Sequence, residues 1–170
     1  FKSVLSDFEK ITQKSWFPYD DNIDGLVFLY LYSNKINLHF MQGTFKEGIP
    51  LIDEVLIGLE KHANQIDEYH IMVFYYKIAS LYFGTGDYEI TIQYLSKIIN
   101  NKSLQMREDL LCFSRILNLV AHYEAGFDYQ LDGLIKSTYK FLIKMEDLYA
   151  VQKEMVLFLK GLGCLLYTSP

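Results

Sequence analysis

The side chains that could carry out catalysis are scattered along this chain and form no known catalytic motif. There is no GxxxxGK(S/T) phosphate loop, no GxGxxG dinucleotide loop, no HExxH zinc motif and no GxSxG nucleophile turn. Histidine is the commonest general base and metal ligand, but no two histidines lie four residues apart on one helical face. We therefore expect no enzymatic activity, no metal and no cofactor, and we interpret His39 and His122 as packed or capping residues.

Adjacent carboxylates occur at Asp20/Asp21 and Asp67/Glu68, and paired carboxylates can act as general acid and base. Both pairs fall where a helix is expected to begin. A carboxylate at this position interacts favourably with the positive end of the helix dipole. We interpret the two pairs as helix caps.

The composition predicts a folded protein with an acidic balance. Of 170 residues, 51% are hydrophobic, which is enough to fill a core. Sixteen basic residues are scattered among twenty-one acidic ones, whereas nucleic acids and anionic membranes require a basic face. No uncharged apolar run is long enough to span a membrane, and Cys112 and Cys164 form no disulfide framework. We expect a cytoplasmic protein that binds neither membrane nor nucleic acid.

A glycine-containing turn occurs three times along the chain, each time between two apolar segments. The aromatic residues that follow these glycines, Phe45, Tyr88 and Tyr129, are 43 and 41 residues apart. A repeat of this length is typical of stacked helical hairpins, because one hairpin cannot bury its own apolar face.

Apolar residues at spacings of three and four predict helices throughout and no strands. Thr44 and Glu47 have the spacing of a capping box, and Pro50 predicts a kink in the helix that follows. The expected helices cover residues 1–15, 22–41, 44–62, 68–84, 88–100, 104–125, 129–145 and 148–160.

Large, small and aromatic residues recur at fixed positions in the middle of the chain: Tyr75, Ile78, Ala79, Tyr82, Gly86, Tyr88 and Thr91. This pattern resembles the tetratricopeptide repeat, in which the small residues lie where the two helices of a hairpin cross. The flanking repeats keep part of it, including Tyr32, Ile36 and Gly43 before it and Leu119 and Tyr123 after it. The resemblance implies an all-α, right-handed superhelical solenoid of antiparallel hairpins at 22–62, 67–101 and 104–145, within one domain of residues 1–163. The long period suggests a divergent bacterial member.

Partial repeats are expected at both ends. Segment 1–15 aligns with the helix after the first turn when it is shifted by 44 residues, so it is expected to be the second helix of an earlier hairpin. The chain begins without methionine, and residues 164–170 resemble translated adaptor sequence, which suggests a non-native tail. We expect a fragment whose exposed ends favour self-association.

In the tetratricopeptide family, the first helix of each hairpin lines the concave face of the superhelix. Asparagine amides on such a face can hydrogen-bond the backbone of an extended peptide of any sequence. Lys77 is the only basic residue there, so the face does not resemble the carboxylate clamp of chaperone-binding members. The projected ligand-binding residues are Tyr30, Asn34, Asn37, Tyr76, Lys77, Ser80, Phe83 and Asn118.

The resemblance therefore implies a non-enzymatic scaffold that binds a protein or an extended peptide. Two alternatives stay open. The chain could be the peptide-sensing module of a larger, DNA-binding bacterial regulator, or the helical domain of an enzyme whose catalytic part lies elsewhere. These repeats serve many unrelated processes, so the partner is not identified by the sequence.

Overall fold

The computed structural model describes residues 1–17, 20–101, 108–144, 154–155, 157–158 and 161. Within these residues the regular structure is entirely helical, as the sequence predicts. The tail 164–170 and most of the predicted helix 148–160 lie outside the described residues. The helices are α1 (Lys2–Thr12), α2 (Asp21–Gln42), α3 (Phe45–Gly48), α4 (Leu51–Lys61), α5 (Glu68–Thr85), α6 (Tyr88–Ile99), α7 (Glu108–Glu124) and α8 (Asp128–Leu142).

The chain forms two compact units, one comprising residues 1–87 and the other beginning at Tyr88. Their boundary falls inside the predicted hairpin 67–101, so each unit is described by itself. Ala79 and Thr91, the small residues predicted to meet in that hairpin, are both fully buried. Their approach to each other stays a prediction.

Short polar side chains and glycines fix the helix ends. Asp20 caps α2 by accepting a hydrogen bond from the Ile23 backbone N–H, and Asp67 caps α5 in the same way with His70. The repeated turn glycines, Gly43, Gly86 and Gly126, all have positive φ angles of 67°, 84° and 73°. Since a side chain is strained in this conformation, glycine recurs at these turns for a steric reason.

The helix predicted at 44–62 is divided into α3 and α4 at Pro50. Proline has no N–H to donate, so the regular helical hydrogen bonds are interrupted there. Two residues later, the backbone N–H of Ile52 donates to the carbonyl of Ile49, three residues back, at 3.0 Å. The capping box predicted at Thr44 is wrong, because its side chain makes no cap hydrogen bond. Its hydroxyl lies 2.8 Å from Nδ1 of His39 instead.

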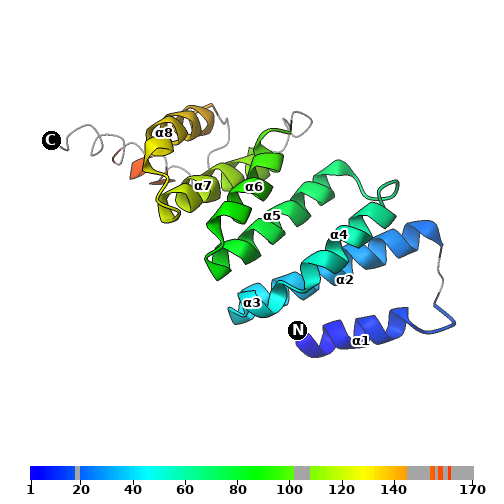
Figure 1. The fold of residues 1–170 in the computed structure, drawn as a ribbon. Coiled ribbons are helices and arrows are strands. Elements are labelled where there is room, and N and C mark those ends of the chain that lie inside the picture. Colours follow the sequence, from blue (N-terminus) through cyan, green and yellow to red (C-terminus); the bar gives the residue numbers. More distant parts are fainter. Residues whose placement is uncertain (18–19, 102–107, 145–153, 156, 159–160, 162–170) are drawn as a thin grey trace. The chain divides into compact units, whose positions relative to one another are not determined.

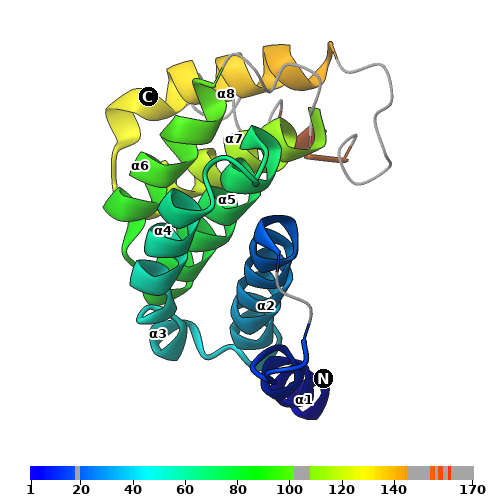
Figure 2. The same ribbon diagram turned by 90° about the vertical axis from the view of Figure 1, so that its right-hand side faces the viewer.

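In the first unit, α2 and α4 form an antiparallel hairpin (Figures 1 and 2). Asp24 at the start of α2 pairs with Lys61 at the end of α4, and Tyr32 in the middle of α2 bonds Glu54 nearer the start of α4. On its other sides α2 packs against α1 and α5. Thus α2 is the central helix of this unit.

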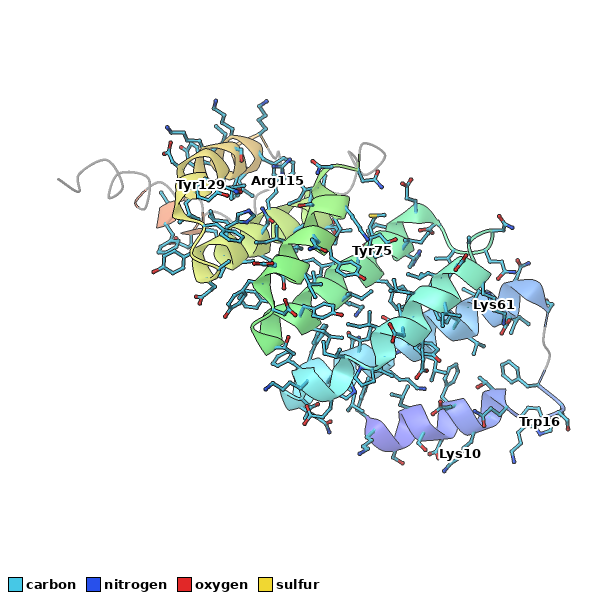
Figure 3. The ribbon with its side chains drawn as sticks, viewed as in Figure 1. Lys10, Trp16, Lys61, Tyr75, Arg115 and Tyr129 are labelled. Carbon is cyan, nitrogen blue, oxygen red and sulfur yellow. The ribbon has the colours of Figure 1, made fainter. Side chains whose placement is uncertain are left out.

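In the second unit, α7 packs against both α6 and α8. Arg115 of α7, labelled in Figure 3, lies 4.6 Å from the ring centroid of Phe141 near the end of α8. His122 near the end of α7 contacts Phe127, which precedes α8, so α7 and α8 run antiparallel. Their shared core comprises Cys112, Leu119, Leu131, Ile135 and Leu142.

Candidate functional site

Two residues of the predicted ligand-binding face meet between α2 and α5. Nζ of Lys77 donates a hydrogen bond to Oδ1 of Asn37, and it lies 5.9 Å from the ring centroid of Phe40. Burial lowers the pKa of Lys77, because desolvation disfavours the charged ammonium. The lysine therefore holds two helices together as well as contributing to the predicted face.

Tyr30 and Asn34 lie on a different side of α2, next to α1. Together with Phe1, Val4, Leu5 and Phe8 they line a shallow, mainly apolar hollow of about 330 Å³. Nδ2 of Asn34 donates to the backbone carbonyl of Tyr30 in its own helix, at 2.8 Å. This amide is therefore already hydrogen-bonded, whereas the Tyr30 side chain is exposed.

The other predicted residues are less exposed than an open groove requires. Tyr76, Ser80 and Phe83 on α5 are half-buried, and the Ser80 hydroxyl donates to the backbone carbonyl of Tyr76 at 2.8 Å. Asn118, which is also projected onto the ligand-binding face, belongs to the second unit and is only 6% exposed. Leu119, on the same helix, belongs to the apolar core, which explains why this part of α7 is buried.

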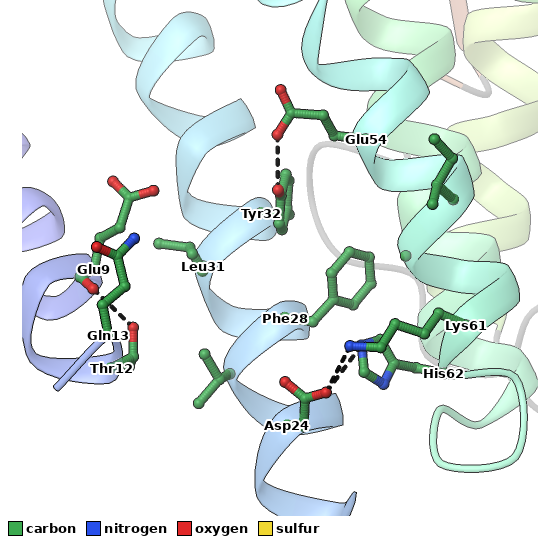
Figure 4. A pocket seen from close by; sticks show the side chains of 13 residues that line it. Glu9, Thr12, Gln13, Asp24, Phe28, Leu31, Tyr32, Glu54, Lys61 and His62 are labelled. Carbon is green, nitrogen blue, oxygen red and sulfur yellow. Dashed lines mark hydrogen bonds and ion pairs between the residues drawn. The ribbon is translucent and has the colours of Figure 1, made fainter. Parts of the chain in front are cut away.

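Sequence reasoning missed a cavity of about 390 Å³ that is lined by α1, α2 and α4 (Figure 4). Its walls combine apolar side chains with three carboxylates, which come from Glu9 of α1, Asp24 of α2 and Glu54 of α4. Phe28 and Leu31 of α2 contribute apolar surface between them. A cavity of this size with a few polar groups is typical of binding sites for small groups.

Each carboxylate of the cavity is held by a neighbour. Oε1 of Glu9 lies 2.7 Å from Nζ of Lys35, and Oδ2 of Asp24 lies 2.8 Å from Nζ of Lys61. Oε2 of Glu54 accepts a 2.7 Å hydrogen bond from the Tyr32 hydroxyl.

The Tyr32 hydroxyl keeps its proton to unusually high pH. Burial, the hydrogen bond to Glu54 and the negative charges of Glu54 and Glu9 together raise its pKa to about 12, and burial is the largest cause. Tyr32 is therefore a hydrogen-bond donor over the whole physiological pH range.

The sequence pattern does not reveal this cavity, because each of its polar residues fits a local structural role. Asp24 stands among the acidic residues that can cap a helix, Tyr32 fits the repeat core, and His62 falls at the end of a helix. The signal that could have found the cavity is the charge pattern of an antiparallel hairpin, which places Asp24 of α2 opposite Lys61 and His62.

In the described part of the chain, no group of three or more His, Cys, Asp and Glu side chains is placed to hold a metal ion. The Cys112 side chain is buried. None of the described helices combines the length and the apolar character needed to cross a membrane. The chain matches no family model, no curated protein and no solved structure.

Proposed function

We propose that the chain is a non-enzymatic scaffold that binds a protein or an extended peptide on stacked, tetratricopeptide-like helical hairpins. The observation that carries the proposal is the contact between α2 and α5, which are the first helices of two successive predicted repeats. The rings of Phe28 and Phe74 lie 5.7 Å apart between these helices. Stacking of equivalent helices is the principle on which solenoid scaffolds are built.

The spacing of the contacts supports this proposal. Phe28 and Phe74 are 46 positions apart, and Asn37 and Lys77 are 40 positions apart, close to the period of about 42 in the turn repeat. Contacts therefore join approximately equivalent positions of the two repeats. A solenoid is the arrangement that continues this pattern along the chain, and the resemblance to the tetratricopeptide repeat implies that it is right-handed.

The proposed binding surface is the polar part of the α2–α5 contact. Asn37 and Lys77 contribute an amide and an ammonium, while Phe40 and Phe83 contribute half-buried aromatic surface. A peptide backbone can bond the amide, and the rings can pack against its side chains.

Selection from a random peptide library on the immobilised protein tests the proposal. We expect enriched peptides whose binding is weakened about tenfold in Asn37→Ala, because a hydrogen bond to the peptide is lost. Asn64→Ala, which changes an exposed asparagine between α4 and α5, is the matched control and should bind normally. A library that yields no peptide above background, or peptides that bind the Asn37 variant as well as wild type, would contradict this site.

A further inference from the structure

The cavity between α1, α2 and α4 lies in the first unit and is separate from the proposed α2–α5 surface. Its hydrogen-bond donors and its hydrogen-bond acceptors differ in how many of them already have a partner. Three of the side-chain donors that line it already have an acceptor. Tyr32 donates to Glu54, Thr12 donates to the Glu9 carbonyl at 2.9 Å, and Lys61 donates to Asp24. The amide of the exposed Gln13 is a further donor in the lining.

The acceptors of the cavity are not all used. Glu9, Asp24 and Glu54 each receive a hydrogen bond on one carboxylate oxygen, and within the described residues the other oxygen receives none. Glu54 differs from the other two, since its partner is the neutral Tyr32 hydroxyl and not a lysine. Its negative charge is therefore the one without a cationic partner in this cavity.

His62 supplies a further open acceptor, and only 4% of this residue is exposed. Its Nδ1 lies 2.7 Å from Oε1 of Gln65. In the neutral tautomer in which Nδ1 donates to this oxygen, Nε2 has a lone pair. Oδ2 of Asp24 lies 3.8 Å from Nε2, too far for a hydrogen bond. In the described part of the chain Nε2 has no hydrogen-bond partner.

The carboxylates of α1 and α4 both act on Tyr32. Burial is the largest cause of the raised pKa of Tyr32, and the negative charges of Glu54 and Glu9 add to it. A cavity with open acceptors, negative charges and apolar walls is complementary to a group that is cationic, rich in donors and carried on an apolar stem.

We propose that this cavity binds an arginine-containing segment of a partner protein, with the guanidinium paired to Glu54 and a second N–H group donating to Nε2 of His62. A guanidinium has five N–H donors in a planar fork that matches a carboxylate, whereas an ammonium is a compact point charge. Glu54 and His62 are eight positions apart, about 12 Å along α4. An extended peptide covers that distance with about four residues, so one segment can reach both.

Nuclear magnetic resonance titration of the whole protein tests the proposal. The probe is the capped peptide acetyl-Ala-Ala-Arg-Ala-Ala-amide, and the readout is the amide shifts of Gly58 and His62, which line the cavity. We expect saturable shifts there, with weaker binding of the lysine peptide. The citrulline peptide, which has a similar shape without charge, should bind at least about tenfold more weakly because no charge-assisted bond forms.

Glu54→Gln removes one charge from an exposed residue and should weaken binding of the arginine peptide about tenfold. Glu60→Gln, which changes an exposed residue of the same helix outside the cavity, should leave binding unchanged. Equal binding of the arginine and citrulline peptides, or no shift of Gly58 and His62 at any peptide concentration, would overturn the proposal. The peptide surface on α2 and α5 is tested separately through Asn37, so failure there leaves this result intact.

Discussion

A Cβ atom added to Gly58 of α4 would lie 1.9 Å from Cε2 of Phe28 of α2. The antiparallel hairpin of the first unit therefore closes over a glycine, and the Phe28 ring occupies the space where a side chain would stand. The same ring lies 5.2 Å from His62 and 5.7 Å from Phe74, so it joins α2 to the end of α4 and to α5. Moving this ring would disturb three helices and the wall of the cavity.

We predict that Gly58→Ala destabilises the protein by about 1–3 kcal/mol, which is the usual cost of overpacking a tight site. The better helix propensity of alanine, about 1 kcal/mol, offsets only part of this. Gly133→Ala is the matched control, because a Cβ at Gly133 of α8 would meet no atom of the described residues within 4 Å. That variant should be more stable than wild type in chemical denaturation. Equal stability of Gly58→Ala and wild type would show that Phe28 can move without cost.

The Asp67 cap of α5 gives a prediction about pH. The backbone hydrogen bond from His70 lowers the pKa of Asp67, so the folded state favours its charged form. The resulting stability is present above the ordinary pKa of 3.8 and is lost as the pH falls through the lower, folded value. Asp67→Ala should cost about 1 kcal/mol at neutral pH, whereas Asp67→Asn keeps the cap and should cost little. Thermal melts of both variants at pH 7 and near pH 3 test this; an equal loss in both would exclude capping as the cause.

Tyr32 gives a prediction about stability at alkaline pH. Its folded pKa of about 12 lies above the ordinary value of 10.0, so the folded state holds the proton more tightly than the unfolded chain does. The corresponding stability is fully present below pH 10 and is lost as the pH rises toward 12. Over this range the melting temperature of Tyr32→Phe should fall less steeply than that of wild type. Parallel curves for the two proteins would argue against a raised pKa.

The all-helical fold and most helix ends of the described residues could be predicted because they depend on local chemistry. Asp20 and Asp67 cap the helices that follow them, and the turn glycines adopt the left-handed conformation. The error at Thr44 has a tertiary cause. The sequence supplies its capping partner at Glu47, but the hydroxyl is taken by His39 at the end of the preceding helix.

The candidate sites were harder to predict because they depend on which faces of several helices meet. A repeat register assigns Tyr30, Asn34 and Asn37 to one face, yet the first two line a hollow with α1 and the third bonds Lys77 on α5. The cavity lined by Glu54 and His62 is formed by residues from three helices. The spacing of these residues in the sequence follows no fixed period. Propensity and spacing determine helices, whereas such a cavity depends on packing distances between them.

The last prediction concerns two buried polar side chains of α7, Ser114 and Asn118. Ser114 is fully buried, and Asn118, one helical turn later, is nearly fully buried. Within the described part of the chain, Oγ of Ser114 and Oδ1 of Asn118 have no hydrogen-bond partner. An unsatisfied buried polar atom costs about 1–3 kcal/mol, so Ser114→Ala should stabilise the protein by about 1 kcal/mol. Ser80→Ala is the contrasting control, since the Ser80 hydroxyl donates to the Tyr76 carbonyl and its removal forfeits that bond. We expect urea unfolding to give a higher midpoint for Ser114→Ala and a change of at most about 0.5 kcal/mol for Ser80→Ala. A lower midpoint for Ser114→Ala would mean that the hydroxyl is hydrogen-bonded in solution, and a search for its partner should then begin with ordered water beside Asn118.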